Sequence, residues 1–388
     1  MKTLRKFILQ KHIYLALIAS VLWGCTTNAV QAEVMDPDPT TSSKKIKIAL
    51  LLDTSNSMDG LINQAKSQLW SLVNELAKAE CNGEVPLLQI ALYEYGNDQL
   101  AASENYIRMV TPLTNDLDKI SQDLFALKTN GGSEFCGAVI QQSLKELDWS
   151  SDSTDLQIVF IAGNEPFTQG AVPYFEACQN ANQKDVIVNS IYCGDFEEGV
   201  RTQWKHGAKI TNGTYMSIDH NKVSQEIETP YDDEIVRLNT DLNKTYIAYG
   251  KQGQDYYLNQ EVQDLNAVQM DKKVLVQRSV SKSKAHYKSG SAKWDMVNKM
   301  EEEEVSVEDF DEEALPAEMK EMDMSERKVY VEEKSEERKK IENEIGELNI
   351  KREKFIAENQ KVDDDELLQN ALIKAIHEQA KTKNISIK

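Results

Sequence analysis

The chain is short of basic residues and of long apolar runs, and each shortage excludes a class of protein. Its 44 lysines and arginines are outnumbered by 64 aspartates and glutamates, which gives a formal net charge of −20. Binding to nucleic acid requires a basic face for the phosphates, so this class is excluded. Beyond an N-terminal leader there is no second long apolar run, and we expect no membrane-spanning helix in the mature chain.

The sequence also lacks the short motifs of common hydrolases and nucleotide-binding enzymes. It contains no His-Glu-x-x-His, no Gly-x-Ser-x-Gly elbow and no Walker A loop. Beyond the leader, histidine occurs only at His206, His220, His286 and His377, which are far apart in the sequence. We therefore expect a protein that is not an enzyme.

The N-terminus is a targeting segment with two alternative processing sites. Basic residues precede an apolar run over 13–23 that is too short to span a membrane. Leu22-Trp23-Gly24-Cys25 resembles a bacterial lipoprotein box, with residues 1–24 removed and Cys25 lipidated. Val30-Gln31-Ala32 instead suits ordinary signal-peptide cleavage, which removes residues 1–32. Either route exports the protein to the periplasm, the outer membrane or the cell surface of a bacterium, where it is at most peripheral to a membrane or anchored by a lipid.

Cysteine is scarce, and its number fits an exported protein. The cysteines after the leader are Cys81, Cys136, Cys178 and Cys193. An even number in an exported chain predicts disulfides, although the sequence does not select a pairing. Four buried free thiols are the alternative.

Apolar runs alternate with amphipathic stretches up to about residue 220. Strands are predicted at 46–53, 87–95, 107–110, 156–162, 186–192 and 214–218, and helices at 61–78, 117–127, 136–147, 172–182 and 198–205. This alternation predicts an α/β domain over residues 45–220, with a doubly wound, mainly parallel sheet flanked by helices. Such sheets bind ligands at the carboxyl ends of their strands.

Beyond residue 220 the chain is polar, charged and mostly helix-favouring. We expect a helical region over 221–300 and an acidic segment over 301–326 that is extended and solvated. A helical tail follows over 327–388, where a coiled-coil-like apolar seam is interrupted by basic residues. The seam consists of Ile341, Ile345, Leu348 and Phe355, and the interruptions are Lys334, Arg338 and Arg352. We interpret this tail as a solvated helical stalk that packs on itself.

The residues with the clearest chemistry are Asp53-Thr54-Ser55-Asn56-Ser57, directly after the first predicted strand. One carboxylate and two hydroxyls at this spacing can converge on a hard cation, because magnesium and calcium prefer oxygen ligands. A helix cap formed by the same residues is the alternative. The pattern Asp-x-Ser-x-Ser resembles the metal-ion-dependent adhesion site (MIDAS) of von Willebrand factor type A (VWA) domains, in particular bacterial exported VWA proteins with a charged helical tail. The resemblance covers residues 45–220 and implies Mg²⁺, Ca²⁺ or Mn²⁺ held by Asp53, Ser55 and Ser57.

Two further loops determine how complete such a site is. In the family, a threonine after paired glycines supplies another hydroxyl ligand, and Ser133 stands in that position here. The third loop usually carries an aspartate, which this chain replaces with Gly163. Asn164, Glu165 and the rim residue Glu134 are the remaining oxygen donors. We therefore expect a weak or incomplete metal site.

These features predict a cation-dependent protein-binding module of the bacterial cell envelope. An Asp or Glu of a partner protein would complete the coordination of the metal, as the resemblance implies. A metal-independent scaffold that acts through its helical tail is the alternative, because Gly163 removes a carboxylate. A metal-dependent hydrolase ranks below both, since only Glu134 and Glu165 could serve as a base beside the cation.

Overall fold

The structure is a computed structural model of the whole chain, and it describes residues 44–59, 62–81, 83–218, 227–359 and 368–387. The leader with Cys25 and both predicted cleavage sites lies outside the described residues, as does His220. The residues described between 44 and 387 belong to one packed unit. Among the helices of the described ranges, none is long and apolar enough to cross a membrane.

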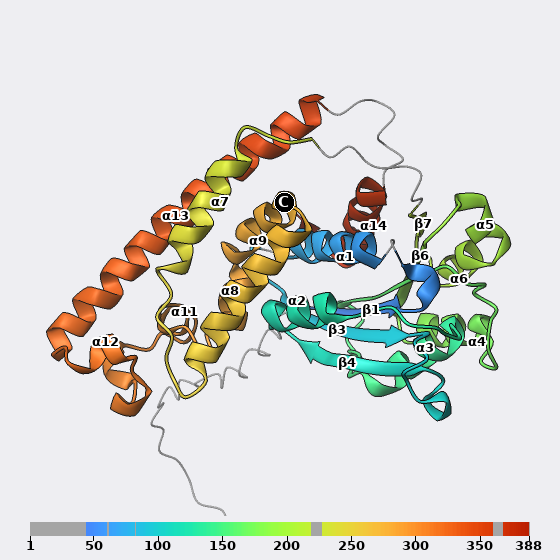
Figure 1. The fold of residues 1–388 in the computed structure, drawn as a ribbon, viewed down its shortest axis with the longest axis horizontal. Coiled ribbons are helices and arrows are strands. Elements are labelled where there is room, and N and C mark those ends of the chain that lie inside the picture. Colours follow the sequence, from blue (N-terminus) through green and yellow to red (C-terminus); the bar gives the residue numbers. More distant parts are fainter. Residues whose placement is uncertain (1–43, 60–61, 82, 219–226, 360–367, 388) are drawn as a thin grey trace, which may run out of the picture. The chain divides into compact units, whose positions relative to one another are not determined.

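A six-stranded sheet in the order β4-β3-β1-β5-β6-β7 forms the core of the first half (Figure 1). Its strands are β1 (Lys45–Asp53), β3 (Leu87–Tyr95), β4 (Ile107–Thr114), β5 (Leu156–Gly163), β6 (Ile187–Tyr192) and β7 (Tyr215–Ser217). Only the edge strand β4 is antiparallel to its neighbour. The predicted doubly wound, mainly parallel sheet is confirmed. Its central strand β1 lies where the chain changes from one side of the sheet to the other, which is where such sheets bind ligands.

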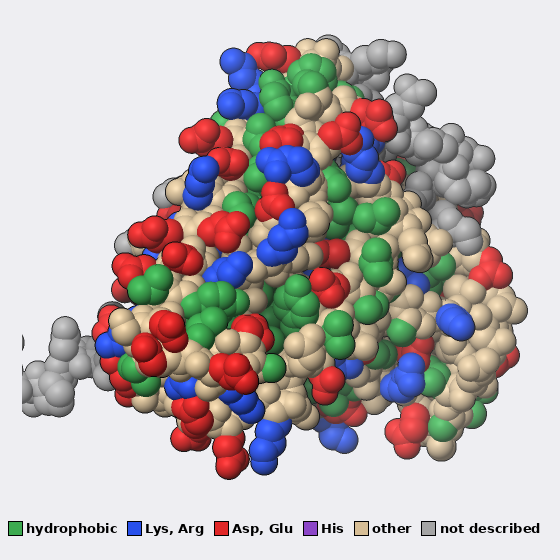
Figure 2. Space-filling model, turned by 60° about the vertical axis from the view of Figure 1, so that its left-hand side comes forward, with side chains coloured by type: hydrophobic (Ala, Val, Ile, Leu, Met, Phe, Trp, Pro, Cys, Tyr) green, Lys and Arg blue, Asp and Glu red, His purple; other side chains and the backbone are tan. Residues whose placement is uncertain are grey.

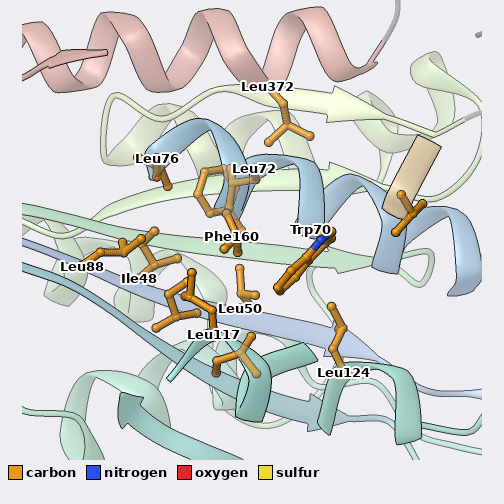
Figure 3. Close-up of a cluster of buried hydrophobic side chains, with 14 of the residues drawn as sticks. Ile48, Leu50, Trp70, Leu72, Leu76, Leu88, Leu117, Leu124, Phe160 and Leu372 are labelled. Atoms are coloured by element: carbon orange, nitrogen blue, oxygen red, sulfur yellow. The ribbon is translucent and has the colours of Figure 1, made fainter. Parts of the chain in front are cut away.

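Successive residues of β1 face two different layers of helices. Ile48 and Leu50 pack toward α1 (Ile62–Leu76) and α2 (Leu117–Ala126). Leu51 belongs to the opposite core, which is formed with α3 (Cys136–Glu146), α4 (Tyr174–Gln183) and α6 (Trp204–Ile210). Burial on both faces explains the almost unbroken apolar runs of β1 and β5. Figure 3 shows Trp70 of α1 and Phe160 of β5 in the first of these cores.

The second half of the chain is helical and packs directly on the first half. It contains α7 (Asp232–Asn243), α8 (Gly253–Met270), α9 (Lys272–Lys282), α10 (Ala285–Ser291) and α11 (Met296–Glu303), and both α9 and the later helix α14 (Leu368–Thr382) pack on α1. Leu372 of α14 points toward Leu72 of α1 in Figure 3. The last strand β8 (Ser386–Ile387) pairs with β2 (Ala79–Glu80). The change in composition near residue 220 therefore does not end the packed unit.

The prediction of an extended, solvated acidic segment over 301–326 is wrong. The segment folds into the 3₁₀ turns η3 (Val307–Asp309) and η4 (Glu312–Ala314) and the short helix α12 (Ala317–Lys320). Its few apolar side chains enter a separate core with Ile247, Met296, Val297 and Val331, and these buried residues are Val307, Leu315 and Met319. The high net charge of the segment led to the wrong prediction, because the apolar residues that become buried are interspersed among the carboxylates.

The predicted stalk that packs on itself is also wrong. The tail begins with one long helix, α13 (Met324–Asn359), which packs on α7, α9 and α11. The arginines that interrupt the apolar seam are part of this contact. Arg338 is only 1 % exposed and donates to Asp295 at 2.5 Å, while Nε of Arg352 lies 2.9 Å from Asp232. Each arginine is paired with a buried carboxylate, which is how charges are accommodated inside proteins.

Candidate metal site

Asp53 ends β1 and is completely buried. The backbone N–H of Ser55 donates to its Oδ1 at 2.8 Å, whereas Oδ2 has no hydrogen-bond partner among the described residues. Burial raises the pKa of Asp53 to about 6, and hydrogen bonds from Ser55 and from the backbone of Asn164 partly offset this. A buried carboxylate oxygen without a partner costs free energy. Oδ2 of Asp53 is therefore the atom at which a ligand is most needed.

The two serines of the motif are adjacent, and the third loop contacts them. Oγ of Ser55 lies 2.8 Å from Oγ of Ser57, which donates to Oδ1 of Asn164 at 2.9 Å. Asn164 returns a hydrogen bond from Nδ2 to the carbonyl oxygen of Ser57 at 3.2 Å. The structure thus brings together the predicted residues Ser55, Ser57 and Asn164. Their arrangement supplies two hydroxyl oxygens and one amide oxygen beside Asp53.

The second loop is held against the first by backbone hydrogen bonds. N–H of Asn130 donates to the carbonyl of Thr54 at 2.9 Å. Gly132 has φ +145°, and a Cβ atom there would lie 1.6 Å from the carbonyl oxygen of Gly96, so only glycine fits. Ser133 follows and is half-buried. The loop lies where the sequence predicts, while the role of Ser133 as a ligand stays a prediction.

Glu134 is buried close to the Asp53 motif, not at the exposed rim of the site where the sequence predicts it. It is 5 % exposed, and its backbone N–H donates to Oε1 of Gln169 at 2.9 Å. A Cβ atom on Gly96 would lie 2.8 Å from Cγ of Glu134 and 2.9 Å from Oδ1 of Asp53, so both acids pack over this glycine. Burial, followed by the charges of Asp53 and Glu165, raises the pKa of Glu134 to about 7, and a hydrogen bond with the Ser55 side chain partly offsets this.

The presence of glycine at position 163, where the family has aspartate, has a steric explanation that the sequence alone did not reveal. A Cβ atom on Gly163 would lie 2.5 Å from the hydroxyl oxygen of Tyr95 and 3.0 Å from Oδ2 of Asp53. Tyr95 is fully buried and donates to the carbonyl of Ala162 at 3.0 Å. Its hydroxyl thus occupies the space into which a side chain at 163 would extend. The pairing of β1 with β3 could have predicted this contact, because it places Tyr95 directly beside Asp53 at the ends of the two strands.

Glu165 contributes negative charge to the site, while its backbone is hydrogen-bonded to Trp204. Its carbonyl oxygen accepts a hydrogen bond from Nε1 of Trp204 at 2.8 Å, and its negative charge raises the pKa of both Asp53 and Glu134. Among the described residues, no three His, Cys, Asp or Glu side chains form a group that could hold a metal ion by themselves. The donors present are instead mainly hydroxyl and amide oxygens with one unpartnered carboxylate oxygen. This set fits a hard cation that keeps several waters, such as Mg²⁺ or Ca²⁺.

The four cysteines of the described ranges, Cys81, Cys136, Cys178 and Cys193, are buried as free thiols, so none of the predicted disulfides is formed among them. Sγ of Cys136 lies 3.8 Å from the hydroxyl of Tyr95, and Sγ of Cys81 lies 3.3 Å from the carbonyl oxygen of Asn384. Burial raises the pKa of Cys178 to about 12. The structure therefore has the alternative arrangement, in which the thiols act as small apolar core residues.

No protein-family model matches the chain, and no curated protein matches it. Among solved structures, the conserved hypothetical protein BatB from Bacteroides thetaiotaomicron is 15 % identical, with a TM-score of 0.35, and the match covers 45 % of this chain and 90 % of that one. The SpRpn10 VWA domain is also 15 % identical with a TM-score of 0.35, covering 45 % and 88 %. Proximal thread matrix protein 1 from the mussel byssus, described with a zinc-occupied MIDAS motif, is 11 % identical with a TM-score of 0.35, covering 47 % and 44 %. Similarity at this level carries no conclusion about ligand or partner.

Proposed function

We propose that this protein is a non-enzymatic, divalent-cation-dependent binding module of the bacterial cell envelope. The observation that carries the proposal is the fully buried Oδ2 of Asp53, which lacks a partner among the described residues. The hydroxyls of Ser55 and Ser57, 2.8 Å apart, lie on the turn that follows it. A cation here would satisfy this oxygen and reduce the repulsion among Asp53, Glu134 and Glu165. The fold places these groups at the carboxyl end of the central strand, the usual ligand position in such sheets.

Each residue of the site has a distinct task in this proposal. Asp53 supplies the anionic oxygen, and Ser55 and Ser57 supply hydroxyl oxygens. Asn164 orients the Ser57 hydroxyl through the 2.9 Å hydrogen bond. The bound cation supplies an open coordination position, which an Asp or Glu of a partner protein fills. Mg²⁺, Ca²⁺ and Mn²⁺ all suit such an oxygen-based site.

Glu134 is the best replacement for the missing aspartate of the third loop. It is buried, and its Cγ packs against Gly96 together with Oδ1 of Asp53. Asn164 is neutral, and the backbone of Glu165 is tied to Trp204. We therefore assign Glu134 the second carboxylate, and Ser133 an auxiliary hydroxyl on the same loop.

A metal-independent scaffold is the second candidate, and one observation favours it. The hydroxyl of Tyr95 fills the space beside Gly163, so the third loop cannot place a carboxylate there without rearrangement. In a scaffold, the helical second half would make the partner contacts. In both proposals the leader exports the protein, by lipidation at Cys25 or by cleavage after Ala32.

Partner retention in the presence and absence of divalent cations separates the two proposals. The full chain is immobilised and exposed to bacterial envelope extract in millimolar Mg²⁺ and Mn²⁺, with and without a chelator. We expect the retained proteins to be lost in chelator and with Asp53→Asn. Asp98→Asn is the matched control, because it removes an exposed carboxylate from a neighbouring loop. Retention that is unchanged in chelator and with Asp53→Asn would support the scaffold and overturn the cation-dependent module.

A further inference from the structure

The start of α13 and the turn before it border an open hollow on the surface, which we call the α13 groove. Its lining consists of Met322, Ser325, Glu326, Val329, Tyr330 and Glu333. The apolar part of this lining is accessible, because Val329 is 52 % exposed and both Met322 and Tyr330 are half-buried. Accessible apolar side chains gathered in a hollow mark an interaction surface.

The groove has an apolar centre with a carboxylate at each end. Glu326, Val329, Tyr330 and Glu333 follow each other at steps of 3, 1 and 3 residues, which places them on one face of α13. The two glutamates are seven residues apart, so they are separated by about 10 Å along the helix axis. Val329 and Tyr330 lie between them.

The carboxylates of the groove are not neutralised by the neighbouring cations of α13. Those basic residues are bound elsewhere: Arg327 to Glu312 at 2.5 Å, Lys328 to Glu308, and Lys334 to the carbonyl oxygen of Lys244 at 3.0 Å. The lining itself contributes two acidic side chains and no basic one. The groove therefore presents negative charge on both sides of its apolar centre.

This arrangement of charge selects the occupant. Figure 2 shows hydrophobic side chains bordered by acidic ones on the side of the molecule that carries α12 and α13 in Figure 1. A helical face with charges seven residues apart suits side-by-side packing with another helix, in which charged pairs flank the apolar contacts. A partner helix with the pattern Lys-x-x-Leu-Leu-x-x-Lys would set its ammonium groups against Glu326 and Glu333 and its leucines against Val329 and Tyr330. The pattern is the same in both chain directions.

We propose that the α13 groove binds a basic amphipathic helix of a partner protein, with Lys or Arg on both sides of a short apolar stretch. Such a helix lays its apolar face into the hollow, and its cations pair with the glutamates at the two ends. The same groove of a second copy is a poorer occupant, because its own glutamates would meet Glu326 and Glu333 and like charges repel. This inference is independent of the metal site.

A synthetic peptide with three repeats of Lys-Ala-Gln-Leu-Leu-Gln-Ala and a terminal fluorescein tests the groove. Fluorescence anisotropy with the full chain should show saturable binding with a Kd of roughly micromolar order. Glu333→Lys and Val329→Asn should each weaken binding at least about fivefold, because the first reverses a charge and the second removes the apolar centre. Glu104→Lys is the matched control, since it makes the same change in net charge at an exposed position of the sheet domain; it should bind the peptide like the unmodified chain.

An exchange of charges tests which groups recognise each other. The double variant Glu326→Lys/Glu333→Lys should bind the peptide in which every Lys is replaced by Glu, whereas the unmodified chain should not. Circular dichroism should show that all variants stay folded, as expected for exposed positions. The proposal is overturned if the lysine peptide does not bind, if Glu104→Lys and Glu333→Lys lose affinity equally, or if the exchange of charges fails. Self-association of the unmodified chain that Glu333→Lys abolishes would overturn it in favour of a second copy as the occupant.

Discussion

At the scale of single residues, the site is defined by what surrounds Asp53. Tyr95 and Gly163 form a matched pair, because the phenol hydroxyl fills the volume that a side chain at 163 would need. Glu134 approaches from the second loop, and Asn164 contacts Ser57 from the third. The departure from the family pattern is therefore a local repacking in which a carboxylate is lost from one loop and another is buried nearby.

This pairing predicts a compensating double substitution. Gly163→Asp alone should lower the thermal midpoint and fail to strengthen cation binding, because its Cβ would lie 2.5 Å from the Tyr95 hydroxyl. Tyr95→Phe removes that oxygen, so Tyr95→Phe/Gly163→Asp should bind Mn²⁺ more tightly than Gly163→Asp. Calorimetric titration of both variants and of Tyr95→Phe as the control measures this. Equal Mn²⁺ affinity in the single and double variants would show that Tyr95 does not exclude the aspartate.

At the scale of elements, α14 completes the core of the sheet domain although it is distant in sequence. Leu372 is buried on α1 beside Leu72 (Figure 3). Leu372→Ala should lower the free energy of unfolding by about 2–5 kcal/mol, the usual result of deleting a large buried side chain. Lys374→Ala on the exposed side of α14 should change it by less than about 0.5 kcal/mol. Urea denaturation measures both. A small effect of Leu372→Ala would mean that α14 does not seal this core.

Helix α10 carries a histidine that should make the protein sensitive to acid. His286 is buried, its Nε2 has no partner in the described structure, and burial lowers its pKa to about 4. In the unfolded chain its pKa is near 6.5. The unfolded state then binds more protons between these values, so stability falls as the pH drops from about 6.5 to about 4.

The change attributable to His286 should reach roughly 3 kcal/mol across that range. His286→Gln cannot take up this proton. As the pH falls, the unmodified chain should therefore lose more unfolding free energy than His286→Gln does. Urea denaturation at pH 7.5, 6 and 5 measures the two curves. Parallel pH dependences would mean that His286 titrates normally in the folded protein.

At the scale of the whole molecule, buried ion pairs tie the helical half to the sheet domain. Arg278 of α9 bonds to Asp118 of α2 and to Asp264 of α8, both at 2.6 Å, and Tyr287 donates to Asp118 at 2.7 Å. These groups come from both sides of residue 220. A fragment that ends there would leave Asp118 buried without its cation and expose the surface of α1.

Replacing Arg278 should consequently be far more harmful than replacing an exposed arginine. Arg278→Met should lower the free energy of unfolding by about 3–5 kcal/mol, because it leaves buried carboxylates without compensation. Arg237 forms ion pairs with Glu234 and Asp241 on the exposed side of α7, and Arg237→Met should lower the free energy of unfolding far less. Equal losses in the two variants on urea denaturation would contradict the structural role of Arg278.

The sequence predicts the sheet well because each buried strand leaves a local apolar run. Asp53, Ser55 and Ser57 can also be identified from the sequence, since they form a local motif directly after such a run. The contact of Tyr95 with the site cannot, because it depends on how its strand pairs with β1. Arg338 misleads for a similar reason, because it is neutralised by Asp295, a carboxylate distant in the chain. Local charge patterns therefore predict exposed helices where the structure has buried ion pairs.

Isothermal titration calorimetry of Mn²⁺ into the full chain tests the central claim most directly. The account predicts one binding event in the unmodified chain and in Asp98→Asn, and none in Asp53→Asn, which lacks the anionic oxygen. Binding should also raise the thermal midpoint of the unmodified chain, because the cation binds only the folded state. Absence of binding heat at millimolar Mn²⁺, or equal heat in Asp53→Asn, would contradict a cation site at Asp53.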